Sequence, residues 1–326
     1  MEPVSILILL AAVFVGWSIG ATSGSNAVGT LVGSRIIGFR TATLVVAVLM
    51  LAGALLQSGP VAETVGGGIV PREILAGCGL AVLSTLLASM FFLVFMTSKA
   101  IPVSVSHVVV GALVGSGISM GVSGEMDYFL VLKIFLSWFL TPVFSLILAF
   151  IFYEIVMVPA SKKVSLVTFS EASRVLVVLG TCFVAYGLGA NSVGSPAGLV
   201  IGSGVVGDTP VLLIVLGVAM GFGVVSFSRR VVYTIARNIT VLDPMTAFAA
   251  QFSAGVVIYF FTLLGIPIST TQAIVGGLVG VGLTKGVGMV NNKLVKIIFL
   301  GWVITPFSAA ILSMLIYTIL KHLPGL

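Results

Sequence analysis

The sequence predicts an all-α polytopic membrane protein, made of two five-segment halves of inverted topology with discontinuous helices. Composition, apolar segment lengths and repeated motifs predict this fold class. Of 326 residues, 59% are hydrophobic and 7% charged, with a mean hydropathy of +1.29. Soluble domains carry about a quarter of charged residues, so soluble enzymes, nucleic-acid readers and disordered proteins are excluded. Residues 44–56 are apolar on every face, unlike the alternating strands of a β-barrel.

Ten apolar segments are candidate membrane spans, because a span needs about 20 mostly apolar residues. The first segment follows Met1-Glu2-Pro3 without a basic stretch, so we expect a retained span and not a cleaved signal. Segments four and nine are also compatible with re-entrant hairpins. The ten segments cover about residues 4–20, 41–57, 74–96, 101–121, 128–157, 173–190, 210–227, 246–264, 266–284 and 297–320.

Three motifs recur in the same order in the two halves, at offsets of 169, 165 and 164 residues. One such motif would be weak, because membrane helices are rich in small residues, but three in register indicate an internal repeat. The repeat halves are 1–157 and 173–326, joined by a hydrophilic cytoplasmic linker at 158–172. The motif pairs are Gly20-Ala21-Thr22-Ser23 with Gly189-Ala190-Asn191-Ser192, Ile101-Pro102-Val103-Ser104-Val105-Ser106-His107 with Ile266-Pro267-Ile268-Ser269-Thr270-Thr271-Gln272, and Trp138-Phe139-Leu140-Thr141-Pro142 with Trp302-Val303-Ile304-Thr305-Pro306.

The charges predict the orientation. If the N-terminus lies outside and all ten segments cross, the inner loops hold every Lys and Arg except Arg72, Lys133 and Lys321. This bias follows the positive-inside rule, so the net charge of +6 needs no nucleic-acid partner. We therefore expect a multi-pass protein of the plasma (inner) membrane with both termini outside. Five crossings per half is an odd number, so the second half is inverted relative to the first.

Inverted repeats with short, interrupted segments are typical of secondary transporters, whose substrate site lies near the bilayer midplane. An enzyme is not expected. The chain has two His residues and contains no HExxH, GxSxG or P-loop motif. Neither a cofactor nor a metal site is identified, and without a nucleotide-binding motif the chain is not a primary pump on its own.

Two polar stretches, 20–34 and 189–204, are interpreted as chain breaks, each followed by a helix N-terminus. Pro196 would suit the first turn of such a helix, and Pro102 and Pro267 precede Ser and Thr residues that can cap helices. A helix N-terminus offers free N–H groups and a partial positive charge. Four such ends, rich in hydroxyl and amide groups, predict a site for a small tetrahedral oxyanion.

Small hydroxyl residues also serve helix packing, which is the simpler explanation for any one motif. Two motif pairs repeated in register at membrane depth favour a binding site, because polar groups are costly there. The predicted substrate-binding residues are Thr22, Ser23, Ser25, Asn26, Ser104, Ser106, Asn191, Ser192, Ser195, Ser269, Thr270 and Thr271.

His107 is the one ionisable side chain in these motifs, and Gln272 is its repeat partner. His107 is either a neutral hydrogen-bonding residue between helices or a group that carries a proton or contacts the anion, since His titrates near neutrality. Gln272 indicates that a neutral hydrogen-bonding group can occupy the mirrored position.

These motifs resemble the PiT family of inorganic phosphate transporters, which carry duplicated Gly-Ala-Asn-Asp-x-x-Asn and Pro-[Ile/Val]-Ser-Thr-Thr-His signatures. Residues 20–26 and 189–195 are similar to the first signature, and 102–107 and 267–272 to the second. The resemblance spans nearly the whole chain. It implies an inverted-repeat fold, cation-coupled uptake of an inorganic anion and often a homodimer. By motif position it implies that the substrate is faced by Asn26, Asn191, Ser104, Ser106, Ser269, Thr270 and Thr271.

The sequence departs from the family where the signature Asp is replaced by Ser23 and Ser192. Those carboxylates resemble cation ligands, so a sodium site built in the family's way is in doubt, and either H⁺ or Na⁺ remains as coupling ion. Hydrogen phosphate carries an O–H group and prefers at least one acceptor in its site, whereas sulfate only accepts. The chain is similar in this to a sulfate-permease-type branch of the family that lacks the Asp.

The sequence therefore predicts a symporter of a small inorganic oxyanion that works by alternating access in the lipid bilayer. Sulfate is the first choice of substrate and phosphate the second. An anion channel would keep the same donors but show uncoupled flux. A membrane scaffold without any site would use the motifs only for packing.

Overall fold

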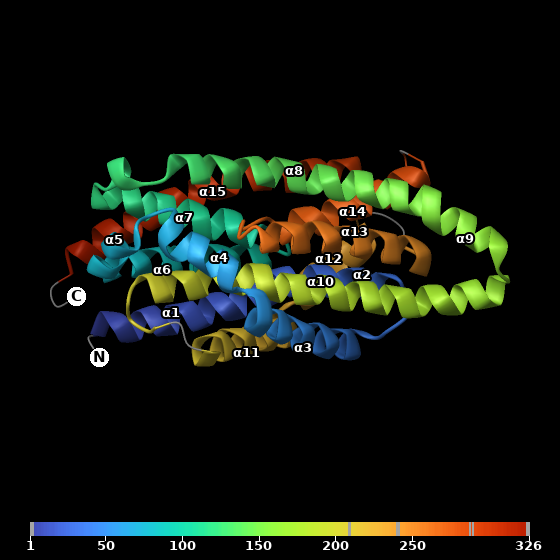
Figure 1. Cartoon of the computed structure of the whole chain (residues 1–326), viewed down its shortest axis with the longest axis horizontal. Coiled ribbons are helices and arrows are strands. Elements are labelled where there is room, and N and C mark those ends of the chain that lie inside the picture. The colour runs from blue at the N-terminus through green and yellow to red at the C-terminus, as the bar shows by residue number, and fades with distance from the viewer. Residues whose placement is uncertain (1–2, 208–209, 239–241, 287, 289, 324–326) are drawn as a thin grey trace.

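The computed structural model describes residues 3–207, 210–238, 242–286, 288 and 290–323, and this part of the chain is helical with no strand (Figure 1). Helices α1 and α2 are joined without interruption by a π-helical turn at Gly20–Gly24, and α8 and α9 by another at Tyr153–Met157. The helices of the first half are α1 Pro3–Ile19, α2 Ser25–Gly33, α3 Phe39–Gln57, α4 Gly59–Glu63, α5 Arg72–Gly77, α6 Gly79–Ser98, α7 Val105–Met120, α8 Tyr128–Phe152 and α9 Val158–Lys163.

The second half begins with one long helix and ends with another. The linker predicted at 158–172 is helical except at residues 164–165, with 158–163 in α9 and 166–172 in α10. Ser165 caps this helix by accepting the Thr168 N–H. The helices of the second half are α10 Leu166–Gly202, α11 Pro210–Phe227, α12 Arg229–Asn238, α13 Pro244–Leu263, α14 Thr270–Thr284 and α15 Asn292–Lys321.

Eight helices of the described chain are long and apolar enough to cross a membrane, which favours the re-entrant alternative for segments four and nine over ten full spans. Of the ten predicted segments, four and nine correspond to α7 and α14, which have 16 and 15 residues. At 1.5 Å per residue they reach only ~24 Å, short of the ~30 Å hydrocarbon core. Apolar composition alone did not reveal this, because the extended residues before each helix are apolar too.

Two helical hairpins lie at opposite ends of the molecule (Figure 1). The α6–α7 pair occupies the end where α1 begins and α15 ends, and the α13–α14 pair occupies the other end. Their tips meet in the interior, where Thr271 Oγ1 donates to the Val103 carbonyl at 3.0 Å. Trp138 of α8 donates from Nε1 to the Pro267 carbonyl at 3.1 Å and fixes the second tip. Because the chain turns back at these tips, α6 with α7 and α13 with α14 agree with re-entrant hairpins, although α6 and α13 are long enough to cross.

The stretches 20–34 and 189–204 are not chain breaks, which corrects that prediction. The first is helical up to residue 33, and the second continues α10 to Gly202. Pro196 lies inside α10 and not at a helix start. Its missing N–H leaves the Ser192 carbonyl without its helical donor, which membrane helices tolerate when neighbours approach. Only two of the four predicted helix N-termini therefore exist.

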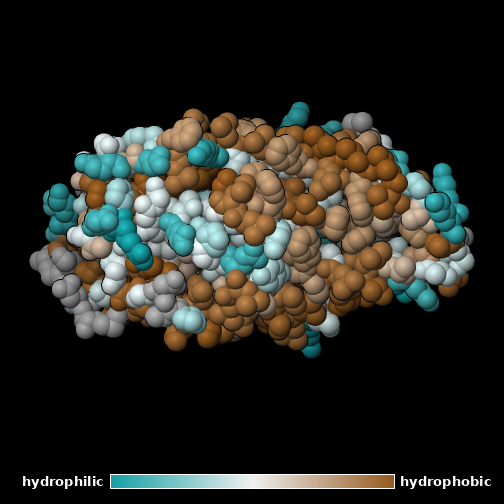
Figure 2. Space-filling view, in the orientation of Figure 1, coloured by the Kyte–Doolittle hydropathy of each residue, from teal (hydrophilic) through white to brown (hydrophobic). Residues whose placement is uncertain are grey.

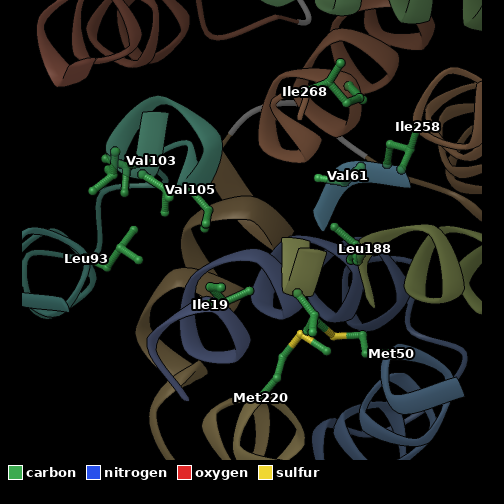
Figure 3. Packing of buried hydrophobic residues seen from close by; sticks show 14 of the residues in the cluster. Ile19, Met50, Val61, Leu93, Val103, Val105, Leu188, Met220, Ile258 and Ile268 are labelled. Carbon is green, nitrogen blue, oxygen red and sulfur yellow. The ribbon is translucent and has the colours of Figure 1, made fainter. Parts of the chain in front are cut away.

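Glycines in these stretches allow helices to cross closely. A Cβ on Gly20 would lie 1.8 Å from the Met220 carbonyl oxygen, and one on Gly189 would lie 1.8 Å from that of Met50. Figure 3 shows the Met50 and Met220 side chains close to each other between the helices. On the face shown in Figure 2, apolar side chains cover most of the middle of the molecule, and hydrophilic ones are most frequent toward its two ends.

Candidate functional site

The two hairpin tips present helix N-termini, as the Pro motifs predict. Residues 101–104 and 266–269 are extended, and α7 and α14 begin directly after them. Ser104 Oγ accepts the His107 N–H at 3.3 Å, and Ser269 Oγ accepts the Gln272 N–H at 3.1 Å. These N-caps are buried, which holds both helix N-termini inside the protein.

Asn26 connects the first signature stretch to the second hairpin. Its Nδ2 donates to Thr271 Oγ1 at 2.8 Å, and Thr271 Oγ1 donates in turn to the Val103 carbonyl. One chain of hydrogen bonds therefore joins α2, the first turn of α14 and the tip before α7. The sequence predicted that Asn26 and Thr271 belong to one site, and the structure brings them into direct contact.

Asn191 makes the corresponding connection from α10. Its Nδ2 donates to Thr262 Oγ1 at 3.0 Å and to the Ile266 carbonyl at 3.1 Å. Thr22 pairs with Thr97 at 2.7 Å between their Oγ1 atoms, so the first signature stretch also contacts the end of α6. Each signature stretch thus contacts the last turn of a hairpin's first helix.

The other predicted residues are buried nearby but differ in their bonding. Ser104 and Ser106 lie 3.1 Å apart through their Oγ atoms, and Ser25 donates to the Thr22 carbonyl of its own helix. That bond of Ser25 is the back-bonding expected of a packing residue. The exposed fraction is at most 4% for every predicted site residue, including Ser192, Ser195, Ser269 and Thr270.

Three buried oxygen atoms in this region have no hydrogen-bond partner. They are Ser23 Oγ, Asn26 Oδ1 and Gln251 Oε1. Gln251 is close to α2, because its Nε2 donates to the Ala27 carbonyl at 3.1 Å. Buried polar atoms are nearly always hydrogen-bonded in native proteins, so these three acceptors are the candidates to meet a ligand that supplies a cation or a donor.

Sequence reasoning missed three of the residues that join this region: Thr97, Thr262 and Gln251. Thr97 and Thr262 each stand five residues before the Pro of a hairpin motif, so extending the repeat backwards would have found them. Gln251 gave no such signal, because the position one repeat offset earlier is Leu86. The only hint was an amide side chain in the middle of the mostly apolar helix α13.

His107 lies in the first turn of α7, where its side chain contacts α15 and α8. Its Nδ1 donates to the Trp302 carbonyl at 2.9 Å, because a carbonyl can only accept. The ring stacks on Trp138 with centroids 3.9 Å apart. The geometry matches the interpretation of His107 as a hydrogen-bonding residue between helices, and together with Gln272 it lines a separate cavity.

Charged groups are scarce around these residues. Within the described ranges no group of three or more His, Cys, Asp or Glu residues could hold a metal ion. The ion pair of the described chain joins Asp243 to Lys285, at the open end of the α13–α14 hairpin. Any ion bound at the hairpin tips would therefore be held by neutral oxygen atoms and N–H groups.

Comparisons with known proteins agree on one family. A model of the phosphate transporter family matches residues 19–313. A protein of Methanocaldococcus jannaschii, provisionally named a phosphate permease, is 29% identical over 311 residues, covering 94% of this chain and 95% of the relative. Inorganic phosphate transporter 2-1, chloroplastic, of Arabidopsis thaliana is 26% identical over 416 residues, covering 95% of this chain and 71% of the relative.

A solved structure described as the sodium-dependent phosphate transporter is 26% identical, with a TM-score of 0.88 and coverage of 98% of this chain and 99% of that one. The resemblance to inorganic phosphate transporters is confirmed, while the likeness to a sulfate-permease-type branch stays a prediction. The family match covers both signature stretches and both hairpins. The chain belongs to the phosphate transporter family.

Proposed function

We propose that this protein is a secondary transporter that carries inorganic phosphate across the membrane by alternating access. The observation that carries the proposal is the meeting of two buried helix N-termini with unpartnered oxygens of Ser23 and Asn26. Helix N-termini favour an anion, and the neutral surroundings keep water and competing charges away. The proposed substrate site consists of the twelve hydroxyl and amide residues predicted from the sequence, together with Gln251.

Phosphate replaces sulfate as the first choice because acceptors are present after all. The sequence favoured sulfate on the ground that Ser23 and Ser192 remove the carboxylate acceptors. Asn26 Oδ1 and Gln251 Oε1 are buried acceptors without a donor. Either atom can accept the O–H of hydrogen phosphate, which sulfate does not have. The similar proteins named above as phosphate permeases or transporters support the same choice.

We propose Na⁺ as the coupling ion. Ser23 Oγ, together with whichever of Asn26 Oδ1 and Gln251 Oε1 does not accept from phosphate, is a neutral oxygen of the kind that suits a hard cation. Coupling to H⁺ is the alternative, with His107 as carrier. It is less favoured because His107 Nδ1 is held by the Trp302 carbonyl and the ring is stacked on Trp138.

The proposal includes two inverted repeat halves, 1–157 and 173–326. Contacts at matched positions support it. Pairing of Thr22 with Thr97 corresponds to that of Asn191 with Thr262. A Cβ on Gly111 would lie 2.3 Å from the Pro306 oxygen, and one on Gly276 would lie 2.4 Å from the Pro142 oxygen. Gly20 against Met220 corresponds in the same way to Gly189 against Met50.

We also propose that both termini face outward from the plasma membrane. The loops that join α2 to α3 and α14 to α15 contribute basic residues to the end opposite the termini (Figure 1). That distribution supports a cytoplasmic location for this end. A homodimer remains the expectation that the family resemblance gives.

Uptake by purified protein in liposomes tests the proposal. Radiolabelled phosphate and sulfate are supplied outside under an inward Na⁺ gradient, an inward H⁺ gradient or neither. We expect phosphate to accumulate above its equilibrium level under the Na⁺ gradient, and excess unlabelled phosphate to compete better than sulfate.

Three results would contradict parts of this account. Flux that only equilibrates under every gradient would indicate a channel. Accumulation of sulfate without phosphate would restore the first choice made from the sequence. Absence of flux of either anion, in protein whose fold is verified by thermal melting, would favour a scaffold.

A further inference from the structure

A groove runs along the outer surface between α1 and α11, which lie side by side in Figure 1. The two backbones approach closely, because a Cβ on Gly223 would lie only 1.9 Å from the Trp17 oxygen. Larger side chains flank this crossing and enclose a volume of about 740 Å³. Three of them, Phe14, Val218 and Phe222, are more than half exposed. The groove therefore faces the acyl chains of a bilayer.

A second pocket, of about 400 Å³, continues the groove at the C-terminal end of α11. Ser226 lines both the groove and this pocket. At the junction, Trp17 Nε1 donates to Ser226 Oγ at 2.9 Å, and the Trp17 ring lies 5.3 Å from that of Phe227. Groove and pocket thus form one continuous surface. The pocket is lined by Thr97, Ser226, Phe227, Arg229, Arg230 and Tyr233.

Two arginines give this pocket a positive charge. Arg230 donates from Nη1 to the Ser98 carbonyl at 3.1 Å, which leaves its other guanidinium N–H groups for a ligand. The ion pair of the described chain joins Asp243 to Lys285, so no carboxylate of this part of the chain neutralises Arg229 or Arg230. Both side chains are exposed. Guanidinium groups bind phosphate oxygens in pairs, so the pocket suits a phosphate ester.

The arginines stand at the depth of lipid headgroups. The helix α11 has 18 residues and is therefore ~27 Å long, close to the ~30 Å hydrocarbon core. Arg229 and Arg230 begin α12 directly after it. Trp17 at the junction is of a residue type enriched at the membrane interface. A soluble anion would fill only the pocket and a plain hydrocarbon only the groove, so an occupant of both has an anionic head and an apolar tail.

We propose that the groove and the pocket together bind an anionic phospholipid. Its phosphate accepts hydrogen bonds from the Arg229 and Arg230 guanidinium groups, and one acyl chain follows the groove past Phe222 and Val218. Basic pockets between transmembrane helices are typical sites for acidic headgroups. Under the orientation proposed above, this lipid belongs to the cytoplasmic leaflet. Its site is separate from the proposed phosphate site at the hairpin tips.

The C-terminal end of α3 provides a comparison within the molecule. It points the opposite way from that of α11, since α3 and α11 pack antiparallel. Tyr186 of α10 donates to Gln57 Oε1 at 3.0 Å there, which resembles the bond between α1 and α11. The neighbouring pocket is lined by one acid, Glu63, and one base, Arg72. A similar junction of helices therefore lacks the excess of positive charge, and we expect a preference for anionic lipid at the α11 end alone.

Quenching of Trp fluorescence by brominated phospholipids tests the proposal on the full chain in liposomes. Trp17 lines the groove, whereas Trp138 and Trp302 line a different cavity, so the signal lost in Trp17→Phe isolates the Trp17 contribution. The probes are phosphatidylglycerol and phosphatidylcholine with identical brominated chains, each at increasing mole fraction in unbrominated phosphatidylcholine. We expect phosphatidylglycerol to bind beside Trp17 roughly five- to twentyfold more tightly than phosphatidylcholine, from the attraction of one or two arginines.

Charge variants locate the headgroup. Arg229→Gln and Arg230→Gln each remove one guanidinium and should each lower the lipid preference several-fold, so failure of one to fold leaves the other. Arg174→Gln is the matched control, because it removes the same charge from an exposed residue that lines neither the groove nor the pocket. Equal quenching by the two lipids, or a preference that all three variants lower equally, would overturn the proposal, since only general surface charge would then be involved.

A groove-filling variant locates the acyl chain. Val218→Phe should weaken phosphatidylglycerol binding, whereas Val211→Phe should not, because Val211 is 66% exposed on the same helix and does not line the groove. Binding unchanged by Val218→Phe would overturn the placement of the chain. Loss of the lipid preference in excess inorganic phosphate at constant ionic strength would assign the pocket to a soluble anion instead. Shielding of Trp17 that depends on cross-linking of two protein copies would assign the groove to a dimer and overturn the proposal. None of these readouts depends on phosphate transport.

Discussion

Asn26 carries both a donor and an acceptor into the proposed phosphate site. Its Nδ2 bonds Thr271, while its Oδ1 has no partner. Replacing it with Ala removes both groups, and one lost hydrogen bond to a charged ligand is worth ~1.5–3 kcal/mol. We therefore expect Asn26→Ala to lower phosphate uptake in liposomes by at least about tenfold. Asn292→Ala, at the exposed start of α15, is the matched control and should transport normally.

Uptake by Asn26→Ala must be normalised to folded protein, because the change also breaks the link between α2 and the α14 tip. A variant with an unchanged melting temperature and unchanged uptake would exclude Asn26 from the site.

Ser23 and Ser192 occupy the positions where the resemblance expects carboxylates. Ser23 Oγ is buried without a hydrogen-bond partner, so a carboxylate at this position would be free to contact a bound ion. The double variant Ser23→Asp, Ser192→Asp introduces two carboxylates that favour a cation and a protonated anion. We expect a stronger dependence of uptake on Na⁺ and a greater preference for phosphate over sulfate, measured by competition. Neither property would change if these positions did not face the bound ions.

At the scale of elements, the close crossings of α1 with α11 and of α3 with α10 require glycine. A Cβ on Gly189 would lie 1.8 Å from the Met50 oxygen, so Gly189→Ala must push α3 and α10 apart. Overpacking of this kind costs ~1–3 kcal/mol. We expect a lower melting temperature for the detergent-solubilised variant. Gly38→Ala is the control, because a Cβ there meets nothing within 4 Å, and equal melting of both variants would contradict the close crossing.

The α13–α14 hairpin is closed by the Asp243–Lys285 ion pair, and Asp243 also caps α13. Burial alone would raise the pKa of Asp243. The hydrogen bonds from Lys285 and Thr246 together outweigh burial, so the pKa lies below the usual 3.8. A carboxyl with a lower pKa in the folded state stabilises the fold above its unfolded pKa and loses that contribution as the pH falls through the folded value. Both side chains are partly exposed, so the contribution is below about 1 kcal/mol.

We therefore expect Asp243→Asn to lower the melting temperature slightly at neutral pH. The difference from the unchanged protein should shrink as the pH falls below about 4. A difference that stays constant over this range would show that the carboxylate charge is not involved.

Some helix boundaries could be predicted from the sequence and others could not. Pro102 and Pro267 followed by hydroxyl residues predicted the starts of α7 and α14, because capping is local chemistry. The stretches around Gly20 and Gly189 were misread as breaks, since Gly, Ser and Asn favour both chain breaks and close helix crossings. The backbone that approaches each glycine comes from a distant part of the chain, so local sequence could not distinguish the two cases.

At the scale of the molecule, the fold class followed from composition, because few charges and long apolar runs permit little besides a helical bundle. The number of crossings did not, since re-entrant hairpins and full spans have similar hydropathy. The site was predicted from repeated motifs, and its hydrogen bonds link residues of both halves. Gln251 was not predicted, because the matching position in the first half is the apolar Leu86 and the repeat therefore gave no signal.

Alternating access through one central site is the central claim, and solute counterflow measures it most directly. Liposomes containing the protein are loaded with unlabelled phosphate and diluted into trace labelled phosphate, with no ion gradient imposed. A carrier exchanges internal for external phosphate at one site, so we predict that the labelled phosphate rises transiently above its equilibrium level and that Asn26→Ala abolishes this rise. A monotonic approach to equilibrium, or a rise that unlabelled internal sulfate supports as well as phosphate does, would contradict the account.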